Sequence, residues 1–257
     1  MSGFDAHTPS IARLYDFWLG GKDNFAADRD LGERLLELYP ATAEIVRENK
    51  GFLTRAVTWV ANQGVDQFID LGAGMPTSPN TLETAAAVVP GARVACVDND
   101  PVVVAHLHAL LEKGTPGVTV VDGDVREADA VLNSVAGGID FGEPACVIMG
   151  SLLHFFPPDV ARDMLRRYAA PLVSGSYLIV SVGRSDGDES DRFISMYEEG
   201  GSRLYYYSQA EITELLSPYE VVPPGITEVR VWRPGWTELP AVRSRSGDVV
   251  GAVARVR

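Results

Sequence analysis

Residues 67–80 read QFIDLGAGMPTSPN, and this stretch decides the fold. An apolar strand ends at Asp70, a turn with two glycines follows, and the next residues begin a helix. We predict Ser78 as the helix N-cap and Pro79 as the first helical residue, because a hydroxyl satisfies the first free N–H groups and proline needs no partner there. Glycines between a strand and a helix let a ligand approach the backbone where a Cβ would collide, so the stretch predicts a nucleotide-binding loop.

The loop differs from the dinucleotide-binding fingerprint. After Gly72 and Gly74 the third glycine position holds Thr77, and Pro76 has no N–H to donate. No Lys or Arg lies between residues 66 and 93. A pyrophosphate would find few donors and no compensating charge here, whereas a cationic, phosphate-free nucleoside would fit.

The composition of the 257-residue chain, 46% hydrophobic and 22% charged, is that of a soluble globular protein. Its formal net charge of −13 argues against nucleic-acid and anionic-membrane partners, which need a basic face, and suits a small-molecule or cationic ligand. No apolar run approaches the roughly 18 residues of a membrane span, and no signal peptide is visible. We therefore expect a cytoplasmic protein; its oligomeric state stays open.

The chain divides into a helical N-terminal part and an alternating remainder. Helices are expected at 10–19, about 28–38 and 42–62. From residue 67 onward strands alternate with helices, which predicts a parallel sheet covered on both faces. After the first strand, further strands are expected at 93–98, 118–121, 145–150, 176–182, about 219–222 and 249–256, the last one antiparallel.

The two cysteines, Cys96 and Cys146, lie in runs that we interpret as buried strands. If both strands flank the strand of Asp70, they are two strand spacings apart, roughly 9.6 Å. A disulfide needs Cα atoms within about 7 Å, so we predict two core thiols. Two cysteines without a histidine cluster also indicate no zinc site.

Asp98 ends the second strand, 24 residues after Gly74. A carboxylate at about this separation can accept hydrogen bonds from both ribose hydroxyls. The alternative is that Asp98, Asn99 and Asp100 together cap the helix that begins at Pro101. Asp100 can cap alone, so we assign Asp98 to the ribose and include Asn99 in the same binding site.

Residues 150–156, GSLLHFF, follow the fourth strand at its carboxyl end. Open α/β sheets bind their ligands at this edge, near the switch point between the first and fourth strands. Ser151 is therefore a candidate binding residue. His154, one of four histidines, is the candidate general base or pocket wall. A histidine that is simply hydrogen-bonded in the turn is the alternative.

The Asp-x-Gly-x-Gly pattern resembles motif I of the class I S-adenosylmethionine-dependent methyltransferases. The N-terminal segment YDFWLGGKDNFAAD (15–28), with residues 70–80, 97–101 (VDNDP) and 232–234 (WRP), closely resembles one bacterial family. That family was first known as a domain of unknown function and later named S-adenosyl methyltransferase. The resemblance covers about residues 8–257.

This resemblance implies a Rossmann-like class I fold, a seven-stranded, mostly parallel sheet of order 3-2-1-4-5-7-6, in residues 63–257. Residues 1–62 would form a helical cap or lid. S-adenosyl-L-methionine would be the cofactor and S-adenosyl-L-homocysteine the product. Asp70 and the loop Gly72-Ala73-Gly74 would contact the cofactor.

The resemblance also assigns residues after the third strand and in the N-terminal segment. Asp124 and Val125 would line the adenine pocket, although Asp124 is equally compatible with a helix N-cap. Gly21 would give flexible backbone to a loop over the cofactor, with Lys22 or Asn24 near the methionine carboxylate. The alternative for this loop is a helix C-cap with a solvated lysine.

The predicted function is methyl transfer from S-adenosylmethionine to an unidentified, small-molecule acceptor, with no metal required. A noncatalytic cofactor-binding or regulatory protein is one alternative. A nicotinamide-dependent dehydrogenase is another, but Thr77 and the late antiparallel strand speak against it.

Overall fold

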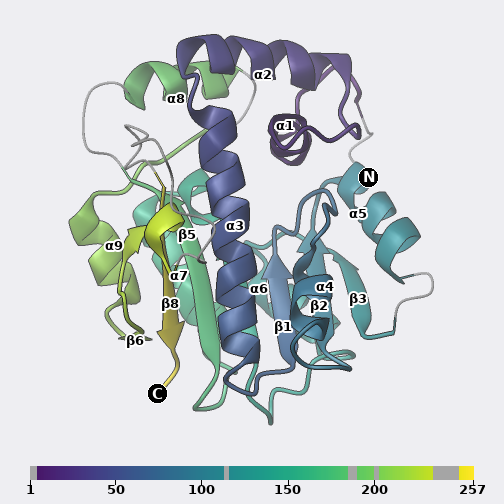
Figure 1. The fold of residues 1–257 in the computed structure, drawn as a ribbon, viewed down its shortest axis with the longest axis vertical. Helices are drawn as coiled ribbons and strands as arrows, with labels where there is room; N and C mark the ends of the chain where they lie inside the picture. The colour runs from purple at the N-terminus through teal and green to yellow at the C-terminus, as the bar shows by residue number, and fades with distance from the viewer. Residues whose placement is uncertain (1–4, 113–115, 185–189, 200–202, 234–248) are drawn as a thin grey trace.

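The structure is a computed structural model and describes residues 5–112, 116–184, 190–199, 203–233 and 249–257. A central sheet runs through the molecule with helices on both faces (Figure 1). Its strands are β1 (Gln67–Leu71), β2 (Arg93–Asp98), β3 (Val118–Asp122), β4 (Cys146–Gly150), β5 (Tyr177–Gly183), β6 (Glu220–Val221), β7 (Thr227–Glu228) and β8 (Val249–Arg255).

The strand order is β3-β2-β1-β4-β5-β8-β6, and β7 pairs with β8 outside this path. The first five strands are parallel, while β8 runs antiparallel to β5, β6 and β7. With β8 as the seventh strand, this is the predicted class I methyltransferase order. The prediction missed β7, a strand of two residues.

The described helices are α1 (Ile11–Trp18), α2 (Ala26–Leu38), α3 (Thr42–Ala61), α4 (Thr81–Ala86), α5 (Pro101–Leu107), α6 (Ala128–Val135), α7 (Pro158–Ala169), α8 (Ser190–Glu199) and α9 (Gln209–Leu216). Short turns η1 (His108–Glu112), η2 (Leu153–Phe155) and η3 (Val229–Val231) complete the elements. In the described part of the chain, no helix has the length and apolarity that crossing a bilayer requires.

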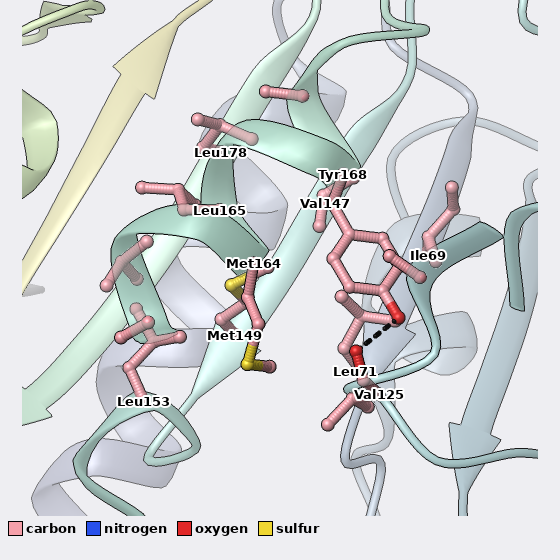
Figure 2. Packing of buried hydrophobic residues seen from close by; sticks show 14 of the residues in the cluster. Ile69, Leu71, Val125, Val147, Met149, Leu153, Met164, Leu165, Tyr168 and Leu178 are labelled. Atoms are coloured by element: carbon pink, nitrogen blue, oxygen red, sulfur yellow. Dashed lines mark hydrogen bonds between the residues drawn. The ribbon is translucent and has the colours of Figure 1, made fainter. Parts of the chain in front are cut away.

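One face of the sheet packs against α6, α7 and α9. Figure 2 shows this core: Leu165 and Tyr168 of α7 lie over the apolar side chains of β1, β4 and β5. The Tyr168 hydroxyl donates to the backbone carbonyl of Val125 (2.9 Å), which ties the segment after β3 to α7. Burying an aromatic ring while satisfying its hydroxyl makes this an ordered part of the core.

The other face of the sheet packs against α3, α4 and α5. The long helix α3 lies lengthwise over this face (Figure 1). Phe52, Ala56 and Val60 of α3 are fully buried against the sheet. The first part of α3 instead joins α1, α2 and α8 in a separate apolar cluster, which includes Leu14 and Leu35. We call α1, α2 and this part of α3 the cap; α3 attaches it to the sheet.

Two local predictions have clear outcomes. Asn80, not Ser78, is the N-cap of α4: its Oδ1 accepts from Glu83 N (2.9 Å) and Glu83 Oε2 accepts from Asn80 N (3.0 Å). This reciprocal capping box satisfies two backbone donors, and Pro79 therefore precedes the helix.

Cys96 and Cys146 are free, buried thiols, as predicted. Pro234 of the 232–234 motif lies outside the described residues.

Candidate functional site

A cavity of about 590 Å³ lies at the carboxyl ends of β1, β2 and β4, against the cap. Its volume is in the range of about 300–1,000 Å³ typical of small-molecule sites, and its place is where open parallel sheets bind ligands. The wall includes Tyr15 and Asp16 of α1, Asn49 and Lys50 of α3, Asp70 with residues 72–74, residues 98–100, and residues 150–151.

The glycine loop forms one side of this cavity. Gly72 and Gly74 have φ of +67° and +66°, a backbone conformation that glycine adopts without strain. The N–H groups of Gly72 and Ala73 both donate to the carbonyl of Val97 (2.9 and 3.1 Å). The N–H of Gly74 donates to Asp98 Oδ2 (2.9 Å). Three successive loop donors are thus used within the protein, so the loop is not a phosphate cradle.

Asp98 lies at the end of β2 with 8% of its surface exposed. Its Oδ1 accepts from Asp100 N (3.0 Å) and its Oδ2 from Gly74 N. Each carboxylate oxygen can accept a further hydrogen bond, as a ribose diol would require. Burial raises the pKa of Asp98, and the bonds from Asp100 and Gly74 oppose that rise. Asp100 caps α5 through Val102 N (2.8 Å), so the capping role does not require Asp98, and its assignment to the ribose stays a prediction.

Lys50 supplies a cation that the loop sequence itself lacks. It comes from α3, lines the cavity, and donates through Nζ to the carbonyl of Thr77 (3.2 Å). Burial lowers the pKa of Lys50, and the carboxylates of Asp70 and Glu83 oppose this. Burial raises the pKa of Asp70, whose Oδ2 accepts from Thr81 Oγ1 (2.5 Å). The cavity wall therefore contains a lysine and a carboxylate whose charges influence each other.

Asn49, the residue before Lys50 in α3, connects this helix to α1 and to the residue that follows β4. It is 1% exposed, and its Nδ2 donates to Tyr15 OH (2.7 Å) and Ser151 Oγ (2.9 Å). Its Oδ1 makes no hydrogen bond with the described residues. Ser151 has φ +50°, uncommon for a residue other than glycine, and its N–H bonds to Ser181 hold it there.

Sequence reasoning missed Asn49 and Lys50, although a signal was present. Asn49 falls on the apolar stripe of α3, four residues after Ile45 and three before Phe52. A polar residue in such a stripe is buried, and a buried amide needs hydrogen-bond partners. That signal indicates a polar contact, but not which element provides it.

The charges around the cavity are mostly negative. Among the described lining residues there are five aspartates against one arginine and one lysine: Asp5, Asp16, Asp70, Asp98 and Asp100 against Arg13 and Lys50. A cavity lined by one sign of charge concentrates ligands of the other sign. This one therefore favours a cationic group, such as a sulfonium or an ammonium.

The loop that was predicted to fold over the cofactor lies outside the cavity wall. Lys22 is exposed, and Asn24 Nδ2 donates to Asp16 Oδ2 (2.8 Å). A Cβ at Gly21 would overlap the Asp16 carboxylate, so glycine is required there. Gly21 and Asn24 thus contact Asp16, which itself lines the cavity. The structure does not bring their side chains to the site.

Asp124 and Val125 also lie outside the wall. The Asp124 carboxylate pairs with the Arg126 guanidinium, which lowers the pKa of Asp124. Val125 packs into the core beneath α7 (Figure 2). Their assignment to adenine therefore depends on the family resemblance and not on the cavity.

His154 is buried in η2 and lines a second, smaller cavity on the far side of Tyr15 and Ser151. Its Nδ1 accepts from Gly183 N (3.1 Å), so its proton is on Nε2. Burial lowers the pKa of His154 to about 4, and the ring is neutral at neutral pH. Neither nitrogen is then available to take a proton, which is the arrangement of a histidine bonded within a turn.

A family model described as S-adenosyl methyltransferase matches residues 1–257. The chain belongs to this family. S-adenosylmethionine is therefore its cofactor, and the chain is a methyltransferase. A search of curated proteins found no match.

Two solved structures resemble this family member over nearly the whole chain. A DUF574 family protein of Streptomyces avermitilis is 32% identical with a TM-score of 0.94, covering 98% of this chain and 99% of that one. A candidate methyltransferase of Thermobifida fusca is 35% identical with a TM-score of 0.91, covering 98% and 97%.

A more distant structure shares only the fold. Magnesium protoporphyrin IX methyltransferase of Synechocystis, solved with bound S-adenosylmethionine, is 15% identical with a TM-score of 0.56 over the full length of both chains. It supports the class I architecture seen in the sheet order.

Proposed function

We propose that the larger cavity binds S-adenosylmethionine and that the enzyme transfers the methyl group to a small molecule. The observation that carries this proposal is Asp98, buried at the end of β2 with both oxygens oriented by backbone donors and facing the cavity. The wall fits the cofactor because it combines an acidic lining for a sulfonium with no phosphate cradle.

The residues of the wall divide among the parts of the cofactor. Asp98 would accept hydrogen bonds from the ribose hydroxyls, with Asn99 beside it. Lys50 would pair with the methionine carboxylate, and Asp70 with its ammonium group. Residues 72–74 would contact the adenosine, since their glycines leave the backbone open.

The cofactor, when bound, supplies an electrophilic methyl group: an acceptor lone pair forms the new bond as the carbon–sulfur bond breaks, its electron pair stays on sulfur, and the acceptor's proton passes to water. The chain contributes the alignment of the two reactants. The cap helices α1 and α3 lie over the cavity and supply Tyr15 and Asn49.

A small acceptor is favoured over a macromolecule by the position of the site. The cavity lies between the sheet edge and the cap, and the net charge of −13 disfavours polyanions. A small molecule can enter a site between the cap and the sheet without displacing one from the other.

The test is calorimetry of the full chain with S-adenosylmethionine, S-adenosylhomocysteine and NAD in parallel. We expect micromolar binding of the first two and no heat with NAD. Incubation with methyl-labelled S-adenosylmethionine and a fraction of cell metabolites below protein size should then transfer label to a small product. Absence of heat with either adenosyl ligand would overturn the binding proposal, and label appearing only in protein or nucleic acid would overturn the small-molecule acceptor.

A further inference from the structure

The larger cavity is not the only internal space beneath the cap. A second cavity of about 80 Å³ lies between α1, α3, η2 and the end of β5. The two cavities share four lining residues: Ile11, Tyr15, Ser151 and Phe155. They therefore meet at one wall, at the carboxyl end of β4.

Asn49 lines the larger cavity, beside this wall, and has an unused acceptor. It donates to the two shared hydroxyl residues, Tyr15 and Ser151, and its own Oδ1 has no partner among the described residues. If the amide is turned the other way, its nitrogen is the unpartnered end instead. Leaving a buried amide group unsatisfied costs about 1–3 kcal/mol, so a group that bonds to it is bound more tightly.

The described residues that line the smaller cavity are largely aromatic. Trp18, Tyr39, Tyr197 and Tyr206 surround it together with the shared Tyr15 and Phe155. None of its described lining residues is Asp, Glu, Lys or Arg, and His154 is held as a neutral hydrogen-bond acceptor. A charged ligand would lose its hydration there without a compensating partner.

We propose that the smaller cavity binds the methyl acceptor and that the acceptor is a neutral, single-ring aromatic compound whose O–H or N–H donates to Asn49 Oδ1. This inference rests on the proposed function, because it places the acceptor next to the cofactor cavity. The aromatic lining holds the ring, and Asn49, which lines the larger cavity, holds the group to be methylated on the cofactor side of the shared wall.

The size of the cavity limits the acceptor. An apolar cavity of about 150 Å³ holds one benzene ring. The smaller cavity, at about 80 Å³, accepts part of a single ring, and the remainder extends past Tyr15 and Ser151 into the larger cavity. The nucleophilic atom then lies on the cofactor side of the wall, where it must be for methyl transfer.

The first experiment measures binding directly, without turnover. Phenol, aniline, toluene and benzoate are titrated by ligand-observed NMR into the full chain saturated with S-adenosylhomocysteine. We expect phenol and aniline to bind about three- to tenfold more tightly than toluene, which lacks the donor, and benzoate to bind more weakly still. Equal binding of toluene and phenol, stronger binding of benzoate, or no binding of any probe would overturn the inference.

The second experiment uses variants of the wall. Asn49→Leu should reduce the phenol-to-toluene affinity ratio to about one, which a purely structural role would not do. Tyr15→Phe keeps the ring and should reduce the same ratio, because it removes the hydroxyl that orients Asn49. Asn62→Leu, at the exposed end of the same helix, is the matched control and should leave the ratio unchanged. A ratio that survives both wall variants contradicts the assignment of Asn49.

The third variant separates the two cavities. Ile45 lines the smaller cavity only, so Ile45→Trp should fill it and abolish phenol binding while the affinity for S-adenosylhomocysteine stays within twofold. Phenol binding that persists in Ile45→Trp would overturn the placement of the acceptor. Failure of the wild-type chain to bind S-adenosylhomocysteine would instead overturn the proposed function itself.

Discussion

Arg13 and Asp28 form a buried ion pair that joins α1 to α2, with Nε 2.8 Å from Oδ2. Arg13 also reaches Asp100 Oδ2 at 3.3 Å, and Ser10 Oγ donates to the same oxygen (2.5 Å). Asp100 is two residues from Asp98, the proposed ribose ligand. The cap is therefore connected by charge to the segment that would hold the cofactor.

Arg13→Met keeps the length of the side chain and removes its charge. We expect the cap to be destabilised by about 3 kcal/mol, the lower end for breaking a buried pair, because Asp28 still accepts from Ser10 N and Phe25 N. Hydrogen exchange should accelerate in residues 10–38 and remain slow in β1 and β4. Arg166→Met, which breaks an exposed pair with Asp163, is the control. Unchanged exchange in the cap would contradict the role of this ion pair.

Asp98→Asn should weaken binding of S-adenosylhomocysteine by about 10- to 150-fold, since hydrogen bonds to a charged group contribute about 1.5–3 kcal/mol. Asp124→Asn should cause a smaller loss, because the Asp124 carboxylate is paired with Arg126 outside the cavity wall. Calorimetry on both variants tests two assignments: Asp98, which the cavity geometry supports, and Asp124, which the family resemblance implies. A larger loss of affinity in Asp124→Asn than in Asp98→Asn would contradict this ranking and favour the assignment of Asp124 to adenine.

Lys50→Ala should weaken binding of S-adenosylhomocysteine by at least tenfold, because it removes the lysine that lines the cavity. Lys22→Ala, which truncates an exposed lysine in the loop after α1, should change affinity less than twofold. The two variants remove the same charge and the same side chain from different places. The opposite ranking would indicate that the loop at residues 20–25, and not Lys50, binds the methionine carboxylate.

The neutral, buried His154 makes stability depend on pH in a defined direction. Its pKa is about 4 in the folded chain against 6.5 for an ordinary histidine, so the unfolded chain takes up a proton first as pH falls. The free energy of unfolding should therefore decrease by up to about 3 kcal/mol between pH 6.5 and 4. His154→Asn retains an acceptor for Gly183 N and should reduce this decrease in denaturant titrations at the two pH values. Parallel pH dependences in wild type and variant would mean that other groups cause it.

Much of the fold follows from local patterns in the chain. The bounds of β2 were predicted to the residue. These patterns are readable because burial on both faces of a parallel strand imposes continuous apolar runs. The N-cap of α4 was misplaced by two residues because several adjacent polar residues could all cap, and only the reciprocal bonds of Asn80 and Glu83 decide between them.

The sequence by itself determined the parallel sheet, the glycine loop and the carboxylate of Asp98, because each depends on residues close together in the chain. Only the tertiary structure decided which cation meets the loop: α3 crosses the sheet and brings Lys50 to Thr77, 27 residues away, while Lys22 stays in solvent. The same crossing brings Asn49 to Ser151, 102 residues away. Periodicity shows which face of a helix is buried, but the partner of that face is set by packing between distant segments.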